Sequence, residues 1–296
     1  MPLRVYPDTV RIVATINRWQ GKLMKVFSVD TEACIHCGFC LSSCGRELLS
    51  LDEAGIPELP EALEKRCTRC GHCAAACPAS AVRLYVAEGE DIRPILDENT
   101  VSPAQADQLM QSRRSIRIFK DDAVPEPVIA DMLQTVRLAP SGGNNQMVRW
   151  ILLRNRQSVK KAADLVAEWF DTVARHDPRH SSRYAIDDIL HSYRAGKDSI
   201  LRSAPHAALA YTNNKASWGP VDSAIALTYF DLAAHARGVG TCWGGYLTRA
   251  TAEYSPLREY LGVPEENTVH CTMVFGYPDI RYHAIPVRNP LQINWI

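Results

Sequence analysis

Two dense runs of cysteines constrain the fold of this chain more than any other feature. Both runs have the spacing C-x2-C-x2-C-x3-C, and their cysteines are Cys34, Cys37, Cys40 and Cys44, then Cys67, Cys70, Cys73 and Cys77. Three thiolates at this spacing can wrap one iron–sulfur cubane while the fourth is carried to a second cluster. The spacing therefore predicts two [4Fe-4S] clusters. The expected ligand sets are Cys34, Cys37, Cys40 and Cys77 for one cluster, and Cys67, Cys70, Cys73 and Cys44 for the other.

Zinc and disulfides are the alternative uses of these cysteines. Zinc sites usually combine two C-x2-C pairs across a longer spacer, and a tetrahedral ion has no use for a dense triplet plus a fourth cysteine. Disulfides need an oxidising compartment, and the N-terminal residues lack the features of a secretory leader, because Arg4 and Arg11 interrupt their apolar character. We therefore favour iron–sulfur clusters.

The exchange of the fourth ligand between the clusters resembles bacterial two-cluster ferredoxins. One position departs from their pattern. Gly45 follows Cys44, whereas Pro78 follows Cys77. The usual rigid exit is therefore present only in the second run.

The composition limits what kind of protein surrounds the clusters. The chain has 296 residues, of which 46% are apolar, so it can bury one substantial core and a smaller module. Lys and Arg together number 33, as do Asp and Glu, so no net field attracts nucleic acid or an anionic membrane. The best membrane candidate, residues 223–234, is short and contains Asp231. We expect a soluble cytoplasmic protein that binds neither nucleic acid nor membrane.

The cysteine runs also divide the chain into domains. Strand-like segments over residues 24–30 and 81–87 bracket the two runs, and Ser102 followed by Pro103 predicts the start of a helix. The expected division is an N-terminal extension over residues 1–23, a two-cluster ferredoxin-like domain over 24–88, a linker over 89–101 and a second domain over 102–296.

The hydrophobic pattern of the second domain alternates between helices and strands. The expected helices cover residues 124–138, 156–176, 185–203, 221–237 and 251–261. Continuous apolar runs predict buried strands over residues 148–153, 207–211 and 269–276, with a glycine-rich turn over 238–245. Strands separated by helices make this domain α/β or α+β.

Two segments of the second domain could bind a phosphate or a flat ligand. Residues 112–117 hold three arginines and a hydroxyl, which could clamp a phosphate through charge-assisted hydrogen bonds. Taken alone, such a run is more often a solvated basic face. In residues 139–146 the glycines would let backbone approach a flat ligand, while Asn144 and Gln146 offer amide groups. Taken alone, this segment would be a loop that ends a helix.

Two later segments add weaker signals of the same kind. Residues 238–245 are rich in glycine and so in accessible backbone amides, but an isolated glycine pattern has little specificity. The exit Gly276-Tyr277-Pro278 precedes Arg288, an arginine that could serve the same phosphate.

Taken together and in this order, the four segments resemble the nitroreductase family of FMN-dependent enzymes, and the whole chain resembles its ferredoxin-fused branch. The resemblance implies an α+β fold that works as an intertwined homodimer with FMN at the subunit interface. It implies that Arg113, Arg114, Ser115 and Arg288 hold the phosphate and ribityl chain, that Ser141, Gly142 and Asn144 approach the flavin, and that Gly244 and Gly245 present amides to its reactive edge. The implied cofactor contacts also include Arg117, Pro140, Gln146 and Trp243.

The chain departs from the family pattern at two places. Gln146 is followed by Met147-Val148-Arg149, where many relatives have a Pro-Trp pair, and Gly244 stands where some carry an acidic residue. Both departures concern the face that meets the substrate.

No side chain is assigned as a catalytic acid, base or nucleophile, and the flavin itself would carry the chemistry. We interpret His191, His206 and His235 as structural, because their contexts are apolar or helical. We interpret Cys242 as a small buried residue, because its neighbours lack the basic partner that would lower a thiol pKa.

The joined halves predict a reductase that converts single electrons into two-electron reduction. Electrons would pass from a low-potential donor, such as a ferredoxin or flavodoxin, through the clusters to FMN and then to a small planar acceptor. A nitroaromatic, a quinone or an activated alkene would fit. The chain has no strand-Gly-x-Gly-x-x-Gly-helix unit for a nicotinamide. Two alternatives stay open: a dehydrogenase running in the opposite direction, and a redox-sensing or electron-transfer partner protein.

Overall fold

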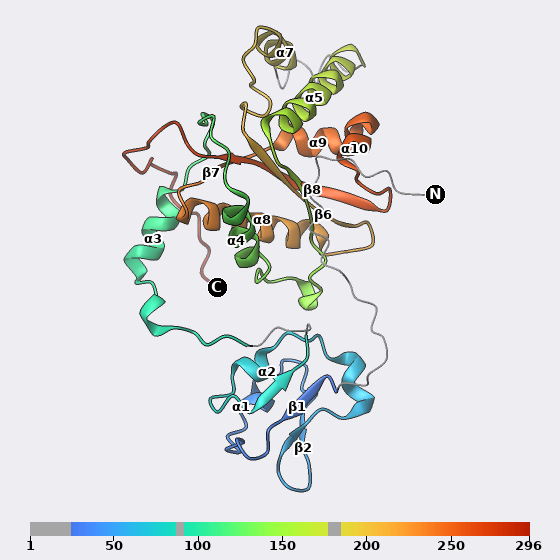
Figure 1. The fold of residues 1–296 in the computed structure, drawn as a ribbon, viewed down its shortest axis with the longest axis vertical. Coiled ribbons are helices and arrows are strands. Elements are labelled where there is room, and N and C mark those ends of the chain that lie inside the picture. Colours follow the sequence, from blue (N-terminus) through green and yellow to red (C-terminus); the bar gives the residue numbers. More distant parts are fainter. Residues whose placement is uncertain (1–24, 87–91, 177–184) are drawn as a thin grey trace. The chain divides into compact units, whose positions relative to one another are not determined.

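The computed structural model describes residues 25–86, 92–176 and 185–296. The expected N-terminal extension over residues 1–23 lies outside the described residues, as do residues 89–91 of the expected linker. The described residues form two compact units (Figure 1): residues 25–86, 92–100 and 143–145 belong to the smaller one, and residues 101–142, 146–176 and 185–296 to the larger. The domain boundaries expected from the sequence stay a prediction.

The smaller unit is built from short elements around the cysteine runs. Strand β1 (Phe27–Val29) pairs antiparallel with β4 (Val82–Leu84), and β2 (Ser50–Leu51) pairs with β3 (Pro57–Glu58). Its helices are α1 (Phe39–Ser42), η1 (Glu61–Arg66) and α2 (His72–Ala75). The core consists of Phe27, Cys40, Ala74 and Val82. Such a small apolar cluster can stabilise the unit only modestly, because little surface is buried.

The larger unit is organised around an antiparallel sheet with strand order β5-β6-β8-β7. Its strands are β5 (Arg149–Leu153), β6 (His206–Asn213), β7 (Gly240–Trp243) and β8 (Asn267–Gly276). The helices are η2 (Asp97–Asn99), which precedes the unit, then α3 (Pro103–Ser112), α4 (Glu126–Val136), η3 (Gly142–Asn144), α5 (Arg156–His176), α7 (Ile186–Arg194), α8 (Gly219–Ala236), α9 (Gly245–Glu253) and α10 (Ser255–Leu261). Helices together with an antiparallel sheet give an α+β fold, as the resemblance implies.

Helices cover both faces of this sheet and form two cores (Figure 1). Along β6, Leu209 packs into the core beneath α5 and α9, whereas its neighbours Ala208 and Ala210 pack beneath α4 and α8. Successive strand residues point to opposite faces, so a continuous apolar strand can supply two cores at once.

Helix α3 begins as the sequence predicts. The Ser102 hydroxyl accepts a hydrogen bond from the Gln105 amide at 3.3 Å, and the Gln105 side chain accepts one from the Ser102 amide at 2.8 Å. This reciprocal capping satisfies two amides that the first turn leaves without helical acceptors. No helix among the described residues is long and apolar enough to cross a membrane.

Two expected helices have the wrong extent. The helix expected over 185–203 ends at Arg194, because Gly196 adopts a left-handed φ of 88° and the Asp198 carboxylate captures the following amides. The single helix expected over 251–261 is two helices, α9 and α10, with Tyr254 extended between them.

The glycine-rich turn expected over 238–245 contains strand β7. Gly238 has a φ of 72° and ends α8, after which the chain pairs with β8. Gly240 is needed in that strand, because a Cβ there would lie 2.4 Å from Cγ1 of Ile116. The glycine at position 240 therefore marks a place where another residue approaches the backbone closely, and the segment is not a turn over its whole length.

Candidate metal and active sites

The first cysteine site is a pocket in the smaller unit. It is lined by Cys34, Ile35, His36, Cys37, Gly38, Cys40, Pro57, Cys77 and Val82. Four of these residues are the cysteines expected to share one cluster. Burial raises the pKa of the Cys40 thiol, and the neighbouring Cys37 and Cys77 thiols raise it further. The fold therefore brings Cys77 from the second run to three cysteines of the first.

The other four cysteines form a matching group. Burial raises the pKa of Cys73 to about 11, and the thiols that add to this effect are those of Cys67, Cys70 and Cys44. Cys44 comes from the first run, so the exchange of the fourth cysteine operates in both directions. No group of Cys, His, Asp or Glu side chains that could hold a single metal ion is found in the described part of the chain.

The backbone around the two runs repeats almost residue for residue. His36 and Arg69, which precede the second cysteine of each run, have φ values of 57° and 52°, and Gly38 and Gly71 have φ values of 73° and 79°. Such conformations are uncommon outside glycine, so their recurrence at matched positions is a specific feature of the loops.

The repeat continues past the fourth cysteine of each run. The amide of Leu48 donates to Cys44 Sγ at 3.5 Å, and the amide of Ala81 donates to Cys77 Sγ at 3.3 Å, each four residues onward. The chain therefore leaves both runs with the same geometry, although Gly45 follows Cys44 and Pro78 follows Cys77. Hydrogen bonds to sulfur are among the features that tune cluster potentials.

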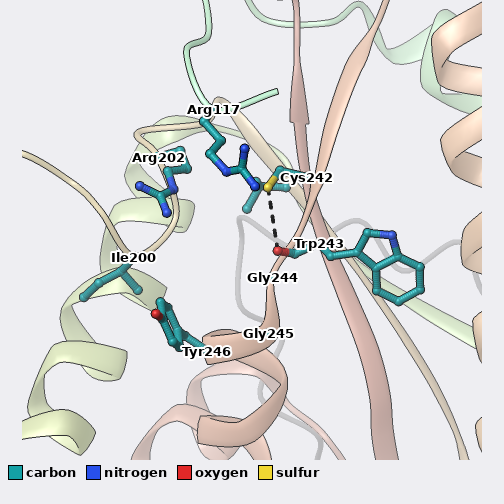
Figure 2. Close-up of a pocket in the computed structure, with 9 residues that line it drawn as sticks. Arg117, Ile200, Arg202, Cys242, Trp243, Gly244, Gly245 and Tyr246 are labelled. Carbon is teal, nitrogen blue, oxygen red and sulfur yellow. Dashed lines mark hydrogen bonds between the residues drawn. The ribbon is translucent and has the colours of Figure 1, made fainter. Parts of the chain in front are cut away.

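A pocket in the larger unit gathers part of the expected flavin site. Figure 2 shows this pocket, which has a volume of about 180 Å³ and is lined by Arg117, Ile200, Arg202, Cys242, Trp243, Gly244, Gly245, Tyr246 and Val274. Four expected cofactor contacts, Arg117, Trp243, Gly244 and Gly245, thus come together from the start and the end of this unit. The Trp243 side chain points away from the pocket in Figure 2.

The turn from β7 into α9 forms one wall of this pocket. The amide of Gly244 donates to the carbonyl of Thr272 at 2.8 Å. It is therefore not free to bind a ligand, contrary to the expectation from the sequence. Gly245 opens α9, where the first amides have no helical acceptors. Burial raises the pKa of Cys242, and the charges of Arg117 and Arg202 oppose this effect. A buried thiol with a raised pKa is a poor nucleophile.

Arg113 lies in a buried polar network instead of that pocket. Its Nη1 is 3.4 Å from Oδ2 of Asp231, a carboxylate on α8 that is 5% exposed, and the Thr241 hydroxyl donates to the other oxygen. Burial raises the pKa of Asp231, against the effects of Thr241 and Arg113. His235 shares the network through a 2.9 Å hydrogen bond to the Ser112 hydroxyl.

The remaining residues of the arginine segment follow β7. Ser115 forms an isolated parallel bridge with Thr241, and the Ile116 amide donates to the Thr241 carbonyl at 2.7 Å. The Arg114 guanidinium donates to the carbonyl of Gln111. The segment is therefore an added edge of the sheet, not a free basic face.

Two backbone amides of the expected flavin loop donate to side chains of the larger unit. The amide of Gly142 donates to Asp222 on α8 at 2.9 Å, and the amide of Gln146 donates to the Ser141 hydroxyl at 3.0 Å. Pro140 is exposed just before this loop. A side chain at Gly142 would place its Cβ 2.7 Å from the Trp218 ring.

The two remaining expected cofactor contacts are Asn144 and Arg288. Asn144 groups with the smaller unit, where its Nδ2 donates to the Thr68 carbonyl at 2.9 Å. Arg288 lies in the exposed segment after β8, and its Nη1 donates to the Val287 carbonyl at 3.4 Å.

Sequence reasoning missed Arg202, because that residue was assigned to a helix. The missed signal was Asp198, which precedes an apolar pair and a Ser-Ala-Pro run leading into β6. Aspartate followed by such residues commonly closes a turn with its own side chain.

Comparison with known proteins identifies both parts of the chain. A model of the nitroreductase family matches residues 110–277, more than half of the sequence. The chain belongs to the nitroreductase family. A 4Fe-4S dicluster domain matches residues 33–81, which hold both cysteine runs. The family membership, the α+β fold and the N-terminal iron–sulfur domain expected from the sequence are confirmed, and the chain is an oxidoreductase of this family.

Relatives match the larger unit of this nitroreductase-family chain. A putative NADH dehydrogenase/NAD(P)H nitroreductase from Archaeoglobus fulgidus is 27% identical over 197 residues, covering 63% of this chain and 95% of the relative. A 4-nitrobenzoate reductase from Nocardioides sp. is 23% identical over 225 residues, covering 65% and 88%. A Bacteroides fragilis nitroreductase solved with bound FMN aligns with a TM-score of 0.53 and 21% identity, over 63% of this chain and 97% of that one. That likeness concerns the fold.

Proposed function

We propose that this protein is an FMN- and iron–sulfur-dependent oxidoreductase. Electrons would pass from a low-potential carrier, such as a ferredoxin or flavodoxin, through two [4Fe-4S] clusters to FMN and on to a small planar acceptor. A nitroaromatic, a quinone or an activated alkene would be suitable. The observation that carries the proposal is the presence in one chain of two four-cysteine groups and an arginine- and glycine-lined pocket.

The two cysteine groups support two cubane clusters. In the pocket of the smaller unit, the four lining thiols come from both runs, as a cubane with one thiolate per iron requires. The left-handed residues and the N–H to sulfur hydrogen bonds, which are matched between the two groups, support the same kind of cluster in the second group. We propose the ligand sets Cys34, Cys37, Cys40 and Cys77, and Cys67, Cys70, Cys73 and Cys44.

The pocket of the larger unit supports FMN binding. Arg117 supplies positive charge, and Gly245 opens α9, whose first amides have no helical acceptors. Bound FMN would supply both one-electron and two-electron chemistry. We propose that Arg113, Arg114 and Ser115 hold its phosphate, with Asp231 orienting the Arg113 guanidinium. The loop of Pro140, Ser141, Gly142, Asn144 and Gln146, together with Trp243, Gly245 and Arg288, completes the proposed set.

Exposed apolar side chains support the proposed homodimer. Helix α8 exposes Val221 and Tyr229, Trp218 is exposed just before it, and the segment after β8 exposes Val287 and Trp295. Burial of these side chains against a partner would be favourable, and a second copy is the partner that the resemblance implies. In such a dimer, Arg288 would serve the other copy's flavin. The expected cytoplasmic location stays a prediction.

Cofactor content tests this proposal directly. Protein purified without oxygen should contain about eight irons and about one flavin per chain, because two cubanes hold eight irons. The Cys70→Ser variant should lose about half of the iron and keep its flavin, because the larger unit has its own cores. Iron and flavin assays on protein that sediments as a dimer provide the measurement.

A matched variant controls for damage to the fold. Cys271→Ser changes a buried thiol of β8 that belongs to neither cysteine group, so it should keep all the iron. Zinc in place of iron, or loss of flavin together with the cluster in Cys70→Ser, would contradict the proposal.

A further inference from the structure

Two positive charges face the pocket of the larger unit. Arg117 and Arg202 both line it, and Figure 2 shows their side chains at the same end of the pocket, with Tyr246 toward the other end. Among the described residues, neither guanidinium is paired with a carboxylate, although Arg113, Arg154, Arg156 and Arg194 are. Two like charges in one pocket repel, and an anion placed between them would relieve that repulsion.

Hydrogen bonds to the Asp198 carboxylate hold the loop that carries Arg202. Both carboxylate oxygens of Asp198 accept backbone hydrogen bonds, from the amides of Ile200 at 2.9 Å, Leu201 at 2.8 Å and Ser203 at 2.8 Å. Arg202 itself has a left-handed φ of 62°. A non-glycine residue in this region costs free energy and persists only where its surroundings hold it.

Buried neighbours anchor this loop on both sides. Leu201 is fully buried, Ile200 is 5% exposed, and both belong to the core beneath α5 and α9. Arg202 is half-buried and lines the pocket, and its backbone is held between these buried residues and the start of β6. The arginine is therefore a fixed part of the pocket wall.

The flavin phosphate is not the anion that this pair suits best. The proposed phosphate contacts are Arg113, Arg114 and Ser115, and Arg113 lies in the Asp231 network on the α8 side of the sheet. The pocket instead contains Gly244 and Gly245, which the resemblance to nitroreductases places near the reactive edge of the flavin. An anion held here would belong to a molecule that approaches that edge.

We propose that Arg202 forms a subsite for the carboxylate of the electron acceptor, beside the proposed flavin contact Arg117. The acceptor class would then be planar aromatic or conjugated carboxylates, with Ile200 and Tyr246 contacting the apolar ring. This inference rests on the proposed function and narrows its acceptor. A guanidinium is suited to the role, because its planar fork matches the two oxygens of a carboxylate.

Ligand binding to the flavin-loaded protein tests the subsite. Benzoate and benzamide have the same shape and differ in charge, so calorimetry with each isolates the charge contribution. Benzoate should bind at least about tenfold more weakly to Arg202→Gln than to the native protein, since a charge-assisted hydrogen bond is lost. Benzamide should bind both proteins equally. The KM for 4-nitrobenzoate should rise by a similar factor in the variant, with the KM for 4-nitrobenzamide unchanged.

Control variants separate this effect from a general loss of charge. Arg154→Gln removes one positive charge from an exposed ion pair with Glu126, so it should change neither affinity. Arg202→Lys keeps the charge without the fork and should fall between the native protein and Arg202→Gln. Equal affinity of the native protein for benzoate and benzamide would overturn the inference even if no variant folded.

Two further outcomes identify what has failed. A tenfold weaker FMN affinity in Arg202→Gln, with both nitro compounds affected alike, would assign the anion to the cofactor phosphate and overturn the inference. A native protein that binds flavin and reduces both compounds with equal KM also overturns the inference, and leaves the proposed function standing. A protein that holds no flavin and reduces neither compound overturns the proposed function itself.

Discussion

His206 is a buried titratable residue whose ionisation should control acid stability. It is 2% exposed, its Nε2 accepts a hydrogen bond from the Val124 amide at 2.9 Å, and burial lowers its pKa to about 4. In the unfolded chain the pKa is near 6.5. Between these values the unfolded chain binds a proton that the folded protein excludes, so stability falls as the pH drops from about 6.5 toward about 4. By linkage the loss is about 3 kcal/mol.

Urea unfolding of the native protein and of His206→Gln at several pH values measures this loss. The glutamine cannot titrate and can still accept from Val124, so the difference in free energy of unfolding between the two proteins should shrink steadily below pH 6.5. A difference that stays constant down to pH 4 would mean that His206 is protonated without penalty in the folded protein.

Single residues were the least predictable part of the site. Arg117, Gly244 and Gly245 could be placed near one another from motifs, because local sequence and resemblance place each motif on a known kind of element. Arg202 could not, since its position depends on three backbone hydrogen bonds to Asp198 and on a left-handed φ. The pairing of Arg113 with Asp231 joins residues 118 positions apart, a contact that no periodic pattern contains.

At the scale of elements, the turn from β7 into α9 should be sensitive to one methyl group. Gly244 has an ordinary φ of −97°, so alanine there would cause no backbone strain, but its Cβ would lie 2.6 Å from the Thr272 hydroxyl. That hydroxyl is buried and donates to the Gly244 carbonyl at 2.7 Å. Gly244→Ala should therefore destabilise the protein by about 1–3 kcal/mol through overpacking.

A double-mutant cycle with Thr272→Ala checks this cause. Removing the hydroxyl opens the space that the new methyl needs, so the two changes together should cost less than their sum by at least about 0.5 kcal/mol. Strictly additive free energies of unfolding would show that the two residues do not compete for that space.

Helices with a clear periodic pattern or capping signal could be predicted from the sequence, whereas the short strand β7 could not. The apolar stripe of α5 (Arg156–His176) and the capping box of Ser102 are local signals, and both elements begin where the sequence predicts. Strand β7 was missed because it is only four residues long and its pairing partner lies about 30 residues onward in β8. The glycines that suggested a turn serve instead to let Ile116 and Thr272 approach the backbone.

At the scale of the whole molecule, the proposed function assigns complementary parts of one redox pathway to the two units. The smaller unit contains two four-cysteine groups suited to single electrons, and the larger contains a flavin-type pocket suited to pairs of electrons. The exchange of fourth cysteines was predicted from the likeness of the spacing to two-cluster ferredoxins, and the fold places Cys77 in one pocket with Cys34, Cys37 and Cys40. The direction of electron flow has no such signature, since the same cofactors serve both directions.

The route of the electrons can be tested with a variant lacking both Cys37 and Cys70, each replaced by serine. If the clusters are the entry path, this variant should lose carrier-driven reduction of its flavin, because a cubane needs all its thiolates. It should still reduce an acceptor once its flavin has been reduced chemically, because the larger unit has its own cores. NADH should reduce the flavin of both proteins at the same slow rate. Anaerobic stopped-flow absorbance follows clusters and flavin separately, and an unchanged carrier-driven rate in the variant would show that the clusters lie off the electron pathway.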